Sequence, residues 1–206
     1  CRETGIRLIV DETYRDFATH TGAPHDLLAR PDWADTLIQL YSFSKAYRLT
    51  GHRVGAVIGD AELLHQIEKF QDTVAICAPS LGQKAALHGL QTLAQWKAEQ
   101  RDEILARRAA LAEAFAPLEV KGWRLKGLGA YFAYVEHPFA MGAADLAPLL
   151  VREAGVLILP ATMFTPPEDP SGDRHFRIAF ANAGAESLRA LCTRLAALDL
   201  PPLQPL

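Results

Sequence analysis

Short runs of apolar, β-branched residues punctuate the first third of the chain. Three of them, at residues 6–10, 36–41 and 54–58, are continuous rather than alternating, and Gly59-Asp60 closes the third. Continuous apolar runs of this length predict strands buried on both faces, as in a parallel sheet. We therefore expect the first part of the chain to build a sheet flanked by helices.

Helical spacing follows the third run. Asp60 suits a helix N-cap because its side chain can accept a backbone N–H of the first turn. The apolar residues that recur at helical spacing after it are Leu63, Leu64, Ile67 and Phe70. A second helix is predicted to begin at residues 79–80. A third, at 93–115, carries scattered charges on one face, which is typical of a long helix with one solvated side.

The pattern changes after Pro117. The elements predicted there are a glycine-containing link at 123–129, a strand at 130–135, a helix at 143–154, a strand at 156–159, a proline-rich loop at 165–173, a strand at 175–180 and a helix at 185–198. This order predicts a small α+β unit. We place the boundary near residue 112, which gives domains 1–112 and 113–206 and an overall α/β fold class.

Composition narrows the range of functions. The 206 residues carry 21 Lys and Arg against 24 Asp and Glu, and these charges are scattered, so neither nucleic acid nor an anionic membrane is an expected partner. No apolar run approaches the roughly 18 residues of a membrane span. Cys1, Cys77 and Cys192 fit neither a disulfide framework nor a zinc spacing, so we expect a reducing, cytoplasmic location.

Two polar clusters lie where predicted strands end. Asp11 and Tyr14 follow the first strand, and Ser42 to Lys45 follow the second, so both fall on the rim where open α/β sheets bind ligands. A primary amine such as that of Lys45 can condense with an aldehyde. A carboxylate such as that of Asp11 can keep a pyridine nitrogen protonated, which lets the ring accept electrons. These two requirements together point to pyridoxal 5'-phosphate.

The remaining polar residues suit the other parts of that cofactor. Tyr14 could donate a hydrogen bond to the ring hydroxyl. Ser42, Ser44 and Arg53 could bind the phosphate through charge-assisted hydrogen bonds. Taken singly, each of these residues fits an ordinary solvated surface equally well, so the prediction depends on their order and spacing as a set.

That ordered set resembles a known family. Asp-Glu-Thr-Tyr at 11–14, Ser-Phe-Ser-Lys at 42–45 and Gly-His-Arg-Val-Gly at 51–55 closely resemble the fold type I pyridoxal-phosphate enzymes, specifically the class I/II aminotransferases. The resemblance implies that Lys45 forms the Schiff base with the cofactor and moves the Cα proton of the substrate. It implies that Asp11 is the partner of the ring nitrogen. Tyr14 would then bind the ring hydroxyl, and Ser42 and Arg53 the phosphate.

The resemblance extends into the second predicted domain. His-Phe-Arg-Ile-Ala-Phe at 175–180 is similar to the small-domain strand whose arginine binds the substrate α-carboxylate, which makes Arg177 the candidate. A guanidinium suits this role because its planar fork pairs with both carboxylate oxygens. Residues 159–164 resemble a substrate-side loop and residues 129–132 a strand near the active-site mouth, although both are expected mainly to pack.

The sequence departs from the family at two positions. Arg48 stands where the family usually has a small residue, so the loop could differ locally or the cation could contact phosphate or a partner subunit. Ala161 stands where glycine is common. The family's amino-terminal segments would precede residue 1. The resemblance therefore implies the carboxyl-terminal half of an enzyme that is a homodimer at full length, with poor folding and no turnover expected of the isolated chain.

Other functions remain open at this point. A carbon–sulfur β-lyase or a decarboxylase of the same fold would use the same cofactor linkage. An aminotransferase-like effector domain of a transcription regulator would need a helix-turn-helix, which these 206 residues do not predict. His20 and His25 stand close together, but no further metal ligands are evident, so no metal site is predicted. Which amino acid and keto acid would be used is left open.

Overall fold

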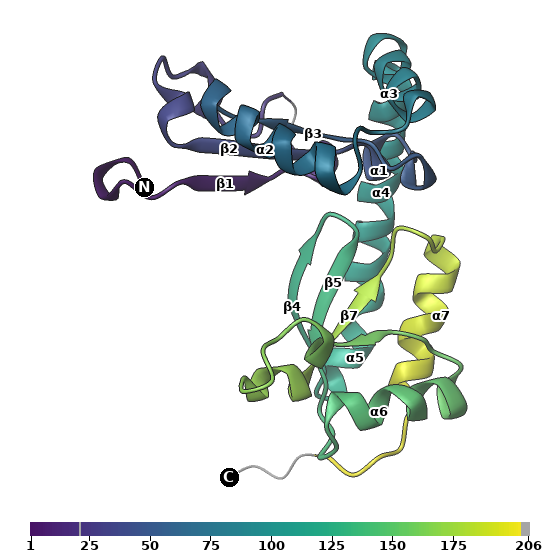
Figure 1. Cartoon of the computed structure of the whole chain (residues 1–206). Coiled ribbons are helices and arrows are strands. Elements are labelled where there is room, and N and C mark those ends of the chain that lie inside the picture. The colour runs from purple at the N-terminus through teal and green to yellow at the C-terminus, as the bar shows by residue number, and fades with distance from the viewer. Residues whose placement is uncertain (21, 203–206) are drawn as a thin grey trace. The chain divides into compact units, whose positions relative to one another are not determined.

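The computed structural model describes residues 1–20 and 22–202 and divides into two compact units (Figure 1). The first unit is Cys1–Asp102 and the second is Glu103–Leu206. The division falls inside the helix α4 (Ala94–Ala114). The two units are therefore described separately, and the division at Asp102 precedes the boundary near residue 112 that the sequence predicts.

The first unit combines a small sheet with helices. Its strands and α-helices are β1 (Leu8–Asp11), β2 (Leu37–Ser42), α1 (Phe43–Ala46), β3 (Gly55–Ile58), α2 (Ala61–Val74), α3 (Ser80–Thr92) and the first part of α4. Its 3₁₀-helices are Arg2–Thr4, Arg15–Phe17, Leu27–Ala29, Trp33–Asp35 and Thr50–His52.

The sheet has the order β1-β2-β3 and places two strand ends side by side. β1 and β2 are parallel, with Asp11 opposite Leu40, so both strands end at the same edge. β3 is antiparallel to β2, with Gly55 opposite Ser42. The prediction of a buried parallel strand at 54–58 is therefore wrong. The chain returns from β2 through α1 and one 3₁₀ turn, without the longer crossover that a parallel pairing requires.

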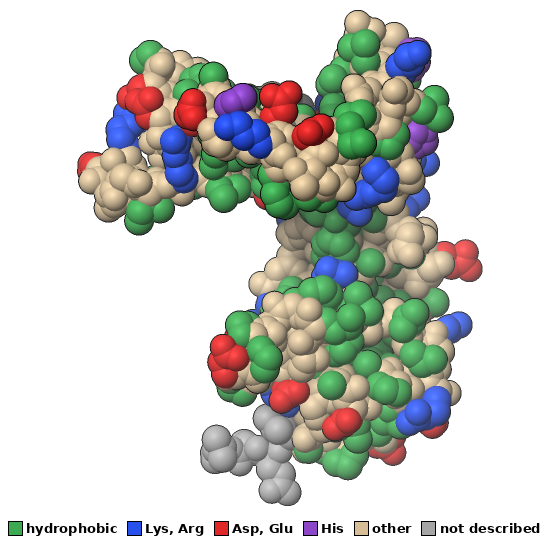
Figure 2. Space-filling model, in the orientation of Figure 1, with side chains coloured by type: hydrophobic (Ala, Val, Ile, Leu, Met, Phe, Trp, Pro, Cys, Tyr) green, Lys and Arg blue, Asp and Glu red, His purple; other side chains and the backbone are tan. Residues whose placement is uncertain are grey.

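The helices of the first unit leave apolar side chains exposed. α2 begins at its N-cap Asp60, whose carboxylate accepts a hydrogen bond from the Leu63 N–H at 2.9 Å, as predicted from the sequence. The exposed large apolar side chains on α2 and α3 are Phe70, Val74, Leu81, Leu87 and Leu90. Figure 2 shows hydrophobic side chains on the surface of α3.

The second unit is a four-stranded antiparallel sheet packed with helices. Its elements are the rest of α4, α5 (Ala116–Val120), β4 (Arg124–Gly129), β5 (Phe132–Glu136), α6 (Ala143–Leu149), a π-helical turn (Leu150–Ala154), β6 (Leu159–Pro160), 3₁₀-helices at Ala161–Met163 and Pro170–Arg174, β7 (His175–Ala179) and α7 (Ala185–Ala196). The strand order is β4-β5-β7-β6. The largest fully buried side chains of its core include Phe115, Trp123, Leu146, Phe176, Phe180 and Leu188.

Three elements of the second unit differ from the sequence prediction. The strand expected at 156–159 is only the two-residue β6, which pairs with β7. The link expected at 123–129 is mostly the strand β4, because pairing with β5 satisfies its backbone and a bulge between Leu125 and Gly127 absorbs the extra residue. The helix expected at 143–154 widens into its π-helical last turn. Pro148 lies inside α6 and has no N–H to donate, which favours this irregularity.

None of the helices in residues 1–20 and 22–202 is long and apolar enough to cross a bilayer.

Candidate active site

Asp11 lies at the end of β1 with its carboxylate held by the next turn. Its Oδ1 accepts hydrogen bonds from the Thr13 N–H at 3.0 Å and the Thr13 hydroxyl at 2.7 Å. The pKa of Asp11 is lowered mainly by the hydrogen bond from the Thr13 hydroxyl and next by the bond from the Thr13 N–H. Burial raises the pKa, but by less than these bonds lower it. The group is therefore a stable anion, as a partner for a protonated ring nitrogen must be.

Lys45 lies on the short helix α1, directly after β2. Ser42 ends the strand and caps the helix, because its Oγ accepts the Ser44 N–H at 3.2 Å. This cap turns the chain so that Lys45 follows within one helical turn. The Lys45 Nζ lies 5.9 Å from the centre of the Tyr14 ring, so the amine and the phenol that the sequence assigned to one site are neighbours.

Arg53 and Ser44 form the polar group that suits a phosphate. Arg53 adopts a left-handed backbone with φ of 51° and directs its Nη1 to the Thr50 carbonyl at 3.0 Å. The same nitrogen lies 3.5 Å from Oγ of the buried Ser44. Since both bonds use one nitrogen, the other donors of the guanidinium fork can bind an anion.

A hollow of about 840 Å³ joins part of this set. Asp11, Ser42 and Arg53 all line it, together with Thr13 and Cys77. Tyr14 shares a second hollow of about 440 Å³ with Asp11. Ser44 and Lys45 line neither hollow, and they are linked to the set through Arg53 and Tyr14. The structure therefore gathers all six residues of the first unit at one edge of its sheet, while their roles stay predictions.

Arg177 lies in the middle of β7 in the second unit. Its guanidinium carbon is 4.4 Å from the centre of the Phe132 ring and 4.1 Å from that of the Phe164 ring. Stacking between two rings limits the rotation of the fork. Nε is buried and has no hydrogen-bond partner within the described part of the chain. A carboxylate ligand would satisfy such a group, so the geometry fits the predicted role.

Several contacts of this site were missed by sequence reasoning. Thr13 fixes Asp11, and an Asp followed two positions later by Thr is a local signal that predicts such a turn. Phe132 and Phe164 stack on Arg177 from segments that were expected mainly to pack, and no local pattern reveals this.

Arg48 and His25 each have a side-chain partner in the first unit. Arg48 has φ of 54°, bonds Gln100 and lies 5.8 Å from the Trp96 ring, so its side chain is directed to α4. His25 pairs with the buried Glu12 at 3.0 Å. Across residues 1–20 and 22–202, no cluster of three His, Cys, Asp or Glu side chains could hold a metal ion.

Known proteins are similar to this chain over most of its length. The family model described as "Aminotransferase class I and II" matches residues 1–195. The "Aromatic aminotransferase ISS1" of Arabidopsis thaliana is 28% identical over 204 residues, which are 95% of this chain and 48% of that protein. The "Arginine--pyruvate transaminase AruH" of Pseudomonas aeruginosa is 30% identical over 200 residues, which are 95% of this chain and 48% of that protein.

A solved structure agrees with these matches. The substrate-bound structure of BacF from Bacillus subtilis superposes with a TM-score of 0.81 at 26% identity and covers 97% of this chain and 49% of that chain. The chain thus spans about half the length of the curated relatives it matches. The α/β fold class predicted from the sequence is confirmed.

Proposed function

This chain belongs to the class I and II aminotransferase family, and from that premise we propose that the whole protein transfers an amino group between an α-amino acid and a 2-keto acid. The family depends on pyridoxal 5'-phosphate. The single observation that carries the proposal is the convergence of Asp11, Ser42 and Arg53 on one hollow, with Lys45 beside Tyr14 at the same sheet edge.

The chemistry of these donors fits the cofactor. The Asp11 carboxylate, whose pKa is lowered by the Thr13 hydroxyl and backbone, would pair with the ring nitrogen. Tyr14 would donate to the ring hydroxyl. The hydroxyls of Ser42 and Ser44 and the fork of Arg53 would bind the phosphate. When bound, the cofactor supplies an electron-accepting ring next to the substrate Cα.

Lys45 has two tasks in this proposal. Its amine would hold the cofactor through the aldehyde group of pyridoxal phosphate. The same Nζ would serve as the base that removes the proton from the substrate Cα. Tyr14, whose ring centre is 5.9 Å away, limits the positions that the amine can take.

Arg177 would bind the substrate α-carboxylate from the second unit. The stacked rings of Phe132 and Phe164 hold the guanidinium, so little rotational entropy is lost when the carboxylate binds. The buried Nε is the donor that gains a partner.

The decisive experiment replaces Lys45 in the whole protein. After incubation with pyridoxal phosphate and reduction with borohydride, mass spectrometry of the wild type should find the cofactor on the peptide that contains Lys45. Lys45→Ala should carry none and lose the visible absorbance, whereas Lys84→Ala, at an exposed lysine on α3, should behave like the wild type. An unchanged visible spectrum in Lys45→Ala would remove the basis of the proposal.

The reaction type is tested separately. An amino acid with 2-oxoglutarate should yield glutamate, whereas release of pyruvate from cystathionine without an acceptor would indicate a β-lyase instead. Arg177 favours transamination only mildly in this comparison, because a β-lyase substrate also carries an α-carboxylate that an arginine can bind.

We also infer that the whole protein is a cytoplasmic homodimer acting in amino acid metabolism. Cys1, Cys77 and Cys192 are all free thiols, which suits a reducing compartment. Exposed apolar residues such as Phe70 and Leu81 are candidates for an interface. Light scattering of the whole protein in solution would measure twice the mass of one chain, and a monomeric mass would refute the dimer.

A further inference from the structure

The candidate cofactor ligands lie on two segments, one with Asp11 and Tyr14 and the other with Ser42 and Lys45. The sheet fixes these segments relative to each other only as far as the ladder between β1 and β2 extends. The ladder between β1 and β2 ends at Asp11 and Leu40, and the last backbone bond joins the Glu12 N–H to the Leu40 carbonyl at 2.8 Å. β1 ends here, whereas β2 continues to Ser42 in pairing with β3. Beyond Glu12 the strand ladder no longer joins the segment that carries Tyr14 to the segment that carries Lys45, and side-chain contacts link the two.

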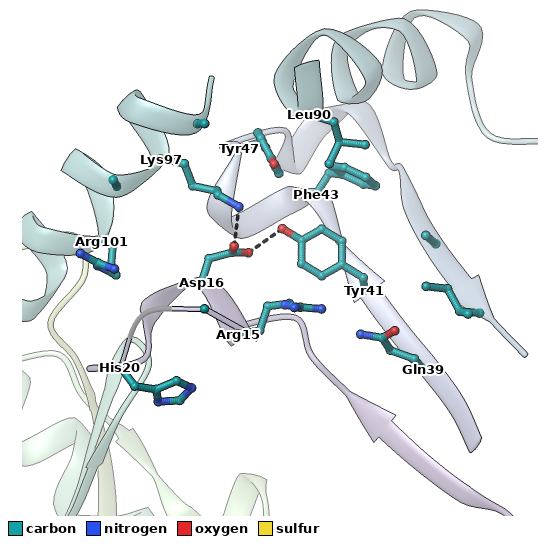
Figure 3. Close-up of a pocket in the computed structure, with 15 residues that line it drawn as sticks. Arg15, Asp16, His20, Gln39, Tyr41, Phe43, Tyr47, Leu90, Lys97 and Arg101 are labelled. Atoms are coloured by element: carbon teal, nitrogen blue, oxygen red, sulfur yellow. Dashed lines mark hydrogen bonds and ion pairs between the residues drawn. The ribbon is translucent and has the colours of Figure 1, made fainter. Parts of the chain in front are cut away.

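Asp16 supplies such a contact between three elements. Its Oδ2 accepts a hydrogen bond from the Tyr41 hydroxyl at 2.6 Å, and its Oδ1 lies 2.7 Å from the Lys97 Nζ. Figure 3 shows the carboxylate between these two donors. Its side chain is only 11% exposed, and that of Lys97 31%. Since Tyr41 directly precedes Ser42 on β2 and Lys97 belongs to α4, this carboxylate ties the Asp11 segment to both.

A series of aromatic contacts leads from Tyr41 back to Lys97, so the contacts form a closed set. Tyr41 packs edge-on against Phe43 with ring centres 5.1 Å apart, and Phe43 packs against Tyr47 at 5.5 Å. The Lys97 Nζ then lies 5.5 Å from the centre of the Tyr47 ring. This closed set of contacts, Asp16–Tyr41–Phe43–Tyr47–Lys97, includes both ends of α1. Phe43 is the first residue of that helix and Tyr47 is its C-cap, and the two flank Lys45 in sequence.

The protonation states of Tyr41 and Lys97 favour a fixed arrangement of the side chains in this set of contacts. Burial raises the pKa of Tyr41, and the hydrogen bond and charge of Asp16 raise it further, so the phenol stays a donor. Burial alone would lower the pKa of Lys97, but the hydrogen bond and charge of Asp16 outweigh it and the pKa is raised. Partly buried networks with satisfied donors are rigid, because each bond is stronger in a low dielectric.

We propose that Asp16, Tyr41 and Lys97 are positioning residues for the cofactor site, which hold the Asp11–Tyr14 segment against α1 so that the Lys45 amine stays at a fixed separation from the Asp11 carboxylate. The three residues act through Lys45, Ser42 and Asp11. This inference rests on the proposed function, since it concerns the orientation of bound pyridoxal phosphate.

The test uses the whole protein and three variants with substitutions at Asp16 or Lys97. Asp16→Asn keeps the shape but removes the charge that binds Lys97. Lys97→Met removes the ammonium, and Lys97→Arg retains a cation that can reach Asp16. The matched control is Asp60→Ala, which removes the N-cap of α2 and the ion pair between Asp60 and Arg7 at 3.1 Å. Neither interaction involves Asp16, Tyr41 or Lys97.

The measurements are the dissociation constant of pyridoxal phosphate, the visible circular dichroism of the bound cofactor and the thermal midpoint. We expect Asp16→Asn and Lys97→Met to weaken cofactor binding about tenfold, the loss typical of a charge-assisted bond. We also expect them to change the sign or size of the visible circular dichroism, which reports ring orientation, and Lys97→Arg to restore it. Asp60→Ala should lower the thermal midpoint without changing either signal.

Two outcomes contradict the inference in distinguishable ways. If Asp16→Asn loses thermal stability like Asp60→Ala while its dichroism and affinity match the wild type, the closed set of contacts is structural only and the inference is wrong. If the wild type itself binds no pyridoxal phosphate, the proposed function fails and the inference fails with it.

Discussion

Replacing Gly82 with alanine tests whether helix α3 sets the position of the loop that carries Arg53. Gly82 is buried on α3, and a Cβ built there would lie 2.6 Å from the backbone oxygen of His52 and 3.4 Å from its Cβ. His52 directly precedes Arg53, the candidate phosphate ligand. A methyl group at Gly82 must therefore displace either the helix or the loop.

The expected magnitude follows from two opposing effects. Alanine in a helix interior gains about 1 kcal/mol over glycine from backbone propensity. Contact with a backbone atom at 2.6 Å cannot be relieved by rotating a side chain, and overpacking of this kind costs about 1–3 kcal/mol. We expect Gly82→Ala to destabilise the protein by about 1 kcal/mol, which lowers the thermal midpoint.

The matched control is Gly51→Ala on the same loop. Nothing lies within 4 Å of a Cβ at Gly51, and its φ is not positive, so the substitution should be neutral or stabilising. The assay is thermal unfolding of the whole protein with and without pyridoxal phosphate. The shift that the cofactor produces should shrink in Gly82→Ala and persist in Gly51→Ala. An increase in stability in Gly82→Ala, with an unchanged cofactor shift, would refute the reasoning.

Two further predictions concern Arg48 and His137. Arg48→Gly should be about 1 kcal/mol more stable than Arg48→Ala in denaturant unfolding, because both lose the contacts with Gln100 and Trp96 and only glycine is unstrained at φ of 54°; equal stabilities would contradict this. His137 is fully buried, and burial lowers its pKa, although its bond to the Asp173 carbonyl at 2.8 Å opposes the shift. The unfolded chain then binds a proton more readily, so stability should fall as pH drops below about 6.5, and His137→Gln should reduce that slope of the free energy of unfolding against pH; an unchanged slope would show that other groups dominate.

The fold was predictable where local patterns decide the structure. Helical spacing after Asp60 and continuous apolar runs before Asp11 each gave the right element. The direction of β3 and the strand β4 were not predictable, because both depend on backbone pairing with other strands. Glycines in residues 123–129 indicate a link by propensity, and only the neighbouring β5 makes a bulged strand more favourable.

The candidate site was predictable as far as it follows strand ends. Asp11 is the last residue of β1 and Lys45 lies in the helical turn that follows β2. The parallel pairing of β1 and β2 brings these two positions to the same edge of the sheet. The contact between Asp16 and Lys97 joins residues that are 81 positions apart, and no periodicity or motif predicts it. Long-range ion pairs of this kind depend on how α4 packs, which the sequence alone does not reveal.

The geometry of the Lys45 loop is set largely by residues outside its own motif. α3 meets it at two glycines, since a Cβ at Gly89 would lie 2.7 Å from the Tyr47 ring, much as one at Gly82 would meet His52. α4 meets it through Lys97. Because these contacts come from helices that follow the motif by dozens of residues, the short motif can place an amine and an arginine in sequence but cannot orient them. A cofactor site transplanted as residues 42–55 alone would therefore lack the surfaces that fix its shape, and substitutions in α3 and α4 should affect cofactor orientation as strongly as many substitutions inside the loop.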